Sequence, residues 1–224
     1  MANRAPGVWS LVLVPALLSL VVTILRLVGE LQGWNDSWFS NVAPSGGFKP
    51  GFMGLVWLIP IFGFWFGLRL RRATGEPPKV GKAALRFLIG AAILIGGFFG
   101  LTAAGLIVMP DATNPGEPKG LGYSLALAGL AAIVMCTAWW RLAKTLIVYA
   151  FLARIPVVAV TYLALRNGWE THYTRLPVGT TLPEGVDSFT FLATPQMTFW
   201  IVSTLMLGGL FGCLGAVVAG RGGK

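Results

Sequence analysis

Arg154 lies in the middle of a long apolar run and is the residue best placed to do chemistry. No other charged residue occurs between Leu146 and Leu165. An arginine at the centre of a bilayer costs at least about 2.5 kcal/mol, so its side chain should face protein or water rather than lipid. Pro156 removes a helical hydrogen bond two residues later, which exposes backbone polarity nearby. We expect Arg154, Pro156 and Tyr149 to form an internal binding point for an anion or a polar solute. The alternative is a structural arginine that binds helix-end carbonyls or extends along the helix to the interface.

A second group of reactive side chains occupies the segment 166–195. It contains Glu170, His172, Tyr173 and Arg175, the raw material of acid–base chemistry. Glu170 and His172 point the same way only in an extended segment. A structured lid held by a hydrogen-bonded histidine is therefore favoured over catalysis. Arg26 and Glu30, four residues apart on one helix, are interpreted as a local surface pair.

Several chemistries are excluded by what the chain lacks. With one histidine, it can form neither a bis-histidine haem site nor a histidine-rich zinc site. Cys136 and Cys213 lie in apolar runs and read as small packing residues, not a disulfide or a metal pair. No phosphate-binding loop, H-E-x-x-H or G-x-S-x-G motif is present. We expect no metal and no cofactor.

The composition of the chain indicates that membrane-spanning helices position these residues. Of the 224 residues, 55% are apolar and only 11% are charged, and mean hydropathy is +0.74. Water-soluble domains carry about 25% charged residues. A membrane-spanning helix needs about 20 mostly apolar residues, and six stretches qualify. The predicted fold is therefore an all-α integral membrane protein, a single domain with a bundle of six transmembrane helices over residues 8–28, 52–70, 87–109, 121–140, 146–165 and 197–219.

The charged residues indicate the orientation of these helices. If six spans alternate, the side with both termini carries eleven basic residues and one acid, Glu76. The opposite side, formed by loops 29–51, 110–120 and 166–196, carries five basic residues and seven acids. Positively charged loops stay in the cytoplasm. We therefore predict a plasma membrane protein, bacterial inner membrane by preference, with both termini cytoplasmic. The formal charge of +9 is then a topology signal, and no nucleic-acid partner is expected.

Small residues at four-residue spacing indicate where helices approach closely. Gly96 and Gly100 lie on one such stripe, Gly208 and Gly212 lie on the longest, and Gly63 and Gly67 extend the pattern to the second span. These stripes predict either a tightly packed bundle or contacts between subunits. Besides the lipid bilayer, the expected partners are a second copy or other membrane subunits, bound through the stripe of the sixth span.

Three functions remain open on the sequence alone. The first is a small permease or channel-like protein with a midplane site for a polar or anionic solute at Arg154. The second is a noncatalytic subunit or scaffold of a membrane complex. The third, which has the weakest support, is a lipid-directed enzyme that uses the 166–195 loop.

Overall fold

The fold was analysed in a computed structural model that describes residues 6–41, 54–77 and 79–221. Helices dominate these residues, and no strand longer than an isolated bridge occurs in them, which confirms the all-helical prediction. The helices are α1 (Val8–Leu31), α2 (Asp36–Phe39), α3 (Leu58–Thr74), α4 (Val80–Ala91), a π-helical turn (Ala92–Gly96), α5 (Gly97–Ala103), α6 (Leu121–Cys136), α7 (Trp140–Arg166), α8 (Ser188–Met197) and α9 (Phe199–Arg221).

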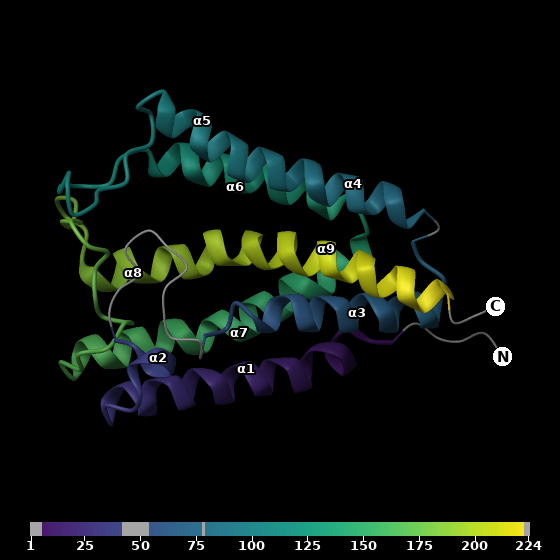
Figure 1. The fold of residues 1–224 in the computed structure, drawn as a ribbon, viewed down its shortest axis with the longest axis horizontal. Coiled ribbons are helices and arrows are strands. Elements are labelled where there is room, and N and C mark those ends of the chain that lie inside the picture. Colours follow the sequence, from purple (N-terminus) through teal and green to yellow (C-terminus); the bar gives the residue numbers. More distant parts are fainter. Residues whose placement is uncertain (1–5, 42–53, 78, 222–224) are drawn as a thin grey trace.

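The long helices run back and forth along one axis, and α9 lies between the α4–α6 hairpin and the group formed by α1, α3 and α7 (Figure 1). At the end where α3 leads into α4, an ion pair of 3.0 Å joins Glu76 to Arg141. At the opposite end, Gly116 exchanges two backbone hydrogen bonds of 2.9 Å with the 179–181 segment. These two contacts hold described loops together at opposite ends of the bundle.

Within residues 6–41, 54–77 and 79–221, four helical segments are long and apolar enough to cross a membrane. They are Val8–Leu31, Val80–Ala103, Trp140–Arg166 and Ser188–Gly220. The remaining long helices, α3 and α6, have 17 and 16 residues. At 1.5 Å per residue they extend about 25 Å, less than the roughly 30 Å of a hydrocarbon core. The structure thus supports a membrane protein with four candidate spans, and the count of six is taken up below as a proposal.

Helix α1 exposes apolar side chains and buries polar ones, the reverse of a helix in a water-soluble protein. Val14 and Leu17 on its outer face are 62% and 59% exposed, whereas Ser19 and Thr23 on its inner face are buried. The hydroxyl of each inner residue donates to a carbonyl four residues earlier, so these polar groups are satisfied within the helix. A surface that exposes large apolar side chains and buries hydroxyls suits lipid better than water.

Helix boundaries differ from the predicted ones. In place of the predicted 87–109 span, the structure has the helical segment Val80–Ala103. It begins earlier than predicted, since Lys82 and Arg86 occupy exposed positions of the helix and do not lie in a loop. Gly105 then adopts a left-handed conformation (φ 72°) that ends the helix. The predicted 52–70 span corresponds to α3, and its first two residues lie outside the described part of the chain. The predicted loop 166–196 contains α8, a helix that the sequence analysis missed.

The closest helix contact joins α3 to α9 through glycine. A Cβ atom added to Gly63 would lie 2.4 Å from the carbonyl oxygen of Gly208, and one added to Gly67 would lie 1.9 Å from that of Gly212. Backbones approach this closely only where side chains are absent. The stripe of α9 is therefore occupied inside the chain, and it offers no free face at Gly208 and Gly212 for a second subunit.

Gly96 and Gly100 behave differently. Both are exposed, and an added Cβ would meet no atom within 4 Å at either position. They therefore do not pack against another helix in the described chain. Of the two uses predicted for such stripes, only a contact between subunits remains open for this one.

Candidate functional site

Arg154 lies near the middle of the 27-residue helix α7, as predicted, and it is only 6% exposed. The side chain is directed toward the junction of α8 and α9. Its Nη1 donates a hydrogen bond of 3.1 Å to Oε1 of Gln196. Its Cζ lies 4.5 Å from the centre of the Trp200 ring, within the range of a cation–π contact. We refer to Arg154, Gln196 and Trp200 as the Arg154 cluster.

A break between α8 and α9 positions the two partners. Helix α8 ends at Met197, and Thr198 leaves the helical conformation (φ −123°, ψ −81°) before α9 begins at Phe199. Pro195 weakens this last turn because it has no backbone N–H to donate. Gln196 thus lies in the last turn of one helix and Trp200 in the first turn of the next. Broken helices of this kind form solute sites in many transporters.

The charge of Arg154 has no counter-ion among the described residues. Each ion pair in that part of the chain involves other side chains. Gln196 supplies a neutral amide oxygen, and Trp200 supplies an aromatic face. A buried cation whose described partners are all neutral can attract an anion, which would supply the missing charge.

The other two residues predicted at this site have different surroundings. The hydroxyl of Tyr149 lies 2.9 Å from that of Ser19 on α1, and its ring packs edge-on against Phe62 and Phe66 of α3. No described hydrogen bond joins it to Arg154, and it connects three helices instead. Pro156 lies within α7, which continues through it to Arg166 without a break. The helix interruption near Arg154 is therefore in its neighbour, not in α7.

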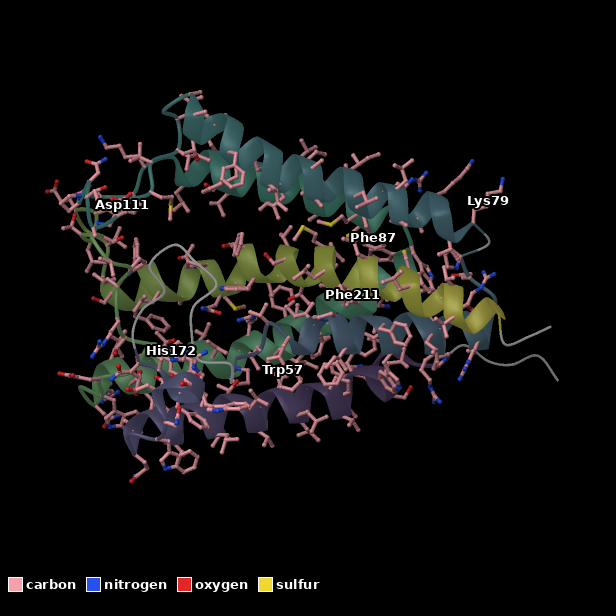
Figure 2. All side chains as sticks on the ribbon, viewed as in Figure 1. Trp57, Lys79, Phe87, Asp111, His172 and Phe211 are labelled. Atoms are coloured by element: carbon pink, nitrogen blue, oxygen red, sulfur yellow. The ribbon has the colours of Figure 1, made fainter. Side chains whose placement is uncertain are left out.

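The loop residues form a second cluster, centred on Glu30. The backbone N–H of His172 donates to Oε2 of Glu30 at 2.9 Å, and Nε of Arg26 donates to Oε1 at 2.8 Å. Nδ1 of His172 also lies 2.5 Å from Oε1, although this contact is not aligned as a hydrogen bond. The Glu30 side chain is fully buried. In Figure 2, His172 lies at the end of the bundle away from the two chain termini. The lid held by a hydrogen-bonded histidine stays a prediction.

Tyr173 extends this Glu30 cluster toward the interior. Its ring lies 3.8 Å from that of His172, and its hydroxyl donates to the carbonyl of Thr23 at 3.4 Å. Glu170 and Arg175 are not part of it. They face each other at 3.7 Å, and the Glu170 side chain is 88% exposed. The structure therefore separates Glu170 from His172, and the carboxylate next to His172 is that of Glu30.

Burial controls the protonation of the two buried loop residues. It lowers the pKa of the His172 imidazole; the Arg26 charge acts in the same direction, and the contacts with Glu30 oppose them. Since Arg26 already compensates the Glu30 carboxylate, the imidazole is neutral at pH 7. Burial raises the pKa of the Tyr173 phenol, while the charges of Arg26 and Arg154 oppose that shift. Tyr173 is thus a neutral phenol, and charges from both clusters act on its pKa.

Sequence reasoning missed Gln196, Trp200 and the burial of Glu30. Gln196 directly precedes the predicted sixth span. A polar residue next to an apolar run is a signal of a site, but the same pattern is typical of a loop. Arg26 and Glu30 were recognised as a pair, but they are buried under the 169–175 segment instead of lying on a free surface.

Two further features bear on ligands. In the described residues, no three His, Cys, Asp or Glu side chains gather as a metal site would require. A groove of about 310 Å³ lies between Val80–Ala84 of α4 and Leu210–Val217 of α9. Its lining is apolar and includes no member of the Arg154 cluster, so it is unsuited to a charged solute.

Comparison with known protein families, with curated protein sequences and with solved structures gives no match for this chain.

Proposed function

We propose that this chain is a six-span membrane protein of the plasma membrane, with both termini in the cytoplasm, and that it acts as a small permease or channel-like protein. The observation that carries the proposal is the burial of Arg154 in the centre of α7 with only neutral described partners. A charge kept there at a cost in insertion energy is a functional-site hypothesis by default. The solute would be small and polar or anionic.

Three contacts support six spans rather than four. The ion pair between Glu76 and Arg141 and the backbone pairing of Gly116 with residues 179–181 hold the two sets of loops at opposite ends. Helix α3 also packs along α9 so closely that both must share one environment. Short helices are tolerated in a bilayer through local thinning or through flanking residues that reach the interface.

The test is anion flux through proteoliposomes that contain the purified full chain. Vesicle swelling is followed by light scattering in potassium chloride, nitrate and acetate, with valinomycin to carry potassium. We expect flux of at least one anion, and its loss in Arg154→Gln. The matched control is Arg166→Gln, at the exposed end of the same helix, which should conduct like the wild type. Wild-type vesicles no more permeable than empty ones, or full flux through Arg154→Gln, would refute the proposal.

A second candidate is a noncatalytic subunit or scaffold, favoured by the exposed stripe at Gly96 and Gly100. Small residues on a lipid-facing surface permit close approach of another helix. This interpretation moves the expected docking face from α9 to the π-helical turn and α5. It predicts an oligomer in mild detergent, seen by light scattering, that Gly100→Leu dissociates while Gly129→Leu on exposed α6 does not. A monomeric wild type would count against it.

A further inference from the structure

The surroundings of Arg154 carry information about the charge of the solute. This inference deepens the proposed function and rests on it, since it concerns the ligand of the same site. The relevant quantity is the sum of charges that face the guanidinium from the described elements packed around it.

The charges that face Arg154 sum to zero, so the guanidinium itself leaves the site with one positive charge. Gln196 and Trp200 are neutral, and Tyr149 and Tyr173 are neutral phenols. The nearest charges of the Glu30 cluster, Arg26 and Glu30, lie 2.8 Å apart and compensate each other. The described part of the protein therefore presents Arg154 as a single uncompensated cation in a buried position.

The guanidinium is also only partly used as a donor. It has five N–H groups in a planar fork. Gln196 accepts from Nη1, and Trp200 covers one face of the plane. No described acceptor lies on the edge formed by Nε and Nη2. That edge is the one that can donate two parallel hydrogen bonds to the two oxygens of a carboxylate.

We propose that the Arg154 site takes a small monocarboxylate, with one carboxylate on the Nε/Nη2 edge, and discriminates against dianions. A single negative charge neutralises the site. A second one would be left without a partner in a low-dielectric interior, where unpaired charges are strongly disfavoured. Neutral solutes leave Arg154 uncompensated and bind more weakly.

The first test measures binding in detergent solution, separately from flux. Purified full chain is titrated at pH 7.5 with propionate, succinate and propionamide, and binding is followed by calorimetry and by the thermal unfolding midpoint. We expect propionate to bind at least tenfold more tightly than succinate, and propionamide to bind no better than succinate. Arg166→Gln should keep this preference.

A second variant addresses the same point without removing the buried arginine. Gln196→Glu places a carboxylate at the position of an oxygen that already lies 3.1 Å from Nη1. It supplies the missing negative charge internally, so it should fold at least as stably as the wild type and lose propionate binding. Gln196→Met removes the amide without adding charge, so it should bind propionate more weakly than the wild type but more tightly than Gln196→Glu, whereas the distant control Arg166→Gln should bind like the wild type.

Each outcome bears on one proposal or the other. Propionate binding without flux in vesicles supports the monocarboxylate site and overturns the permease. Flux of anions with succinate bound as tightly as propionate overturns the monocarboxylate site and leaves the permease standing. Binding of none of the three probes, or full propionate binding to Gln196→Glu, overturns the inference.

Discussion

The carboxylate of Glu30, one residue before the end of α1, accepts a hydrogen bond of 2.9 Å from the backbone N–H of His172, which lies 142 positions later in the chain. The same carboxylate pairs with Arg26 and is shielded completely from solvent. This contact fastens the segment after α7 onto the end of α1. It also places Tyr173 between the loop end of the molecule and the polar residues of its interior.

Removing Glu30 should destabilise the protein strongly. Glu30→Ala leaves Arg26, whose side chain is only 13% exposed, without its counter-charge, and it removes the acceptor of the His172 N–H. Breaking a buried pair from one side costs about 3–5 kcal/mol. Thermal unfolding in detergent should show a clearly lower midpoint. Glu170→Ala is the matched control: that side chain is exposed, so the change should stay within about 0.5 kcal/mol.

Stability should fall as the pH decreases below about 6.5, the ordinary pKa of histidine. Burial lowers the pKa of His172 in the folded protein, so the unfolded chain takes up the proton at a higher pH than the folded one. The stability from a neutral His172 is thus fully present above pH 6.5, is lost as the pH falls, and stops changing below the folded pKa. His172 is the one histidine of the sequence. Unfolding midpoints at pH 7.5 and 5.0 should therefore differ more for the wild type than for His172→Gln; equal differences would contradict the prediction.

The glycine contact between α3 and α9 should tolerate no side chain. Gly67→Ala places a Cβ atom 1.9 Å from the carbonyl oxygen of Gly212, a backbone atom that cannot rotate away. Overpacking typically costs about 1–3 kcal/mol, and here two helices must separate to relieve it. Gly129→Ala on α6 has open space around it and should be neutral or stabilising by up to about 1 kcal/mol. Equal unfolding midpoints for the two variants would disprove the close approach.

The proposed orientation predicts which residues are accessible from outside the cell. Single cysteines replace the exposed residues Lys79 and Glu184 in a background where Cys136 and Cys213 are changed to Ser and Ala. A membrane-impermeant maleimide applied to intact cells should label Glu184→Cys and should reach Lys79→Cys only after permeabilisation. Labelling of both positions in intact cells, or the reverse pattern, would rule out this topology.

Local patterns in the sequence predicted much of this architecture. Apolar runs identified the long helices because hydropathy is a property of each segment by itself. The helix ends were less predictable: Lys82 and Arg86 read as loop residues, yet long basic side chains can lie on a helix and still reach water. Helix α8 was missed because it contains Pro195, a residue typical of loops. Its N-terminus is stabilised by the Asp187 side chain, which accepts from the backbone N–H of Thr190.

The sequence by itself determined an apolar helical chain, two oppositely charged sets of loops, and an arginine in the middle of a long helix. The tertiary structure decided which helices each stripe meets, so that Gly208 and Gly212 pack against α3 and α7 while Gly96 and Gly100 face outward. It also decided that His172 meets Glu30 instead of Glu170, and that Gln196 and Trp200 surround Arg154. The physical reason is that hydropathy and charge act residue by residue, whereas these contacts depend on how distant helices pack and turn relative to one another.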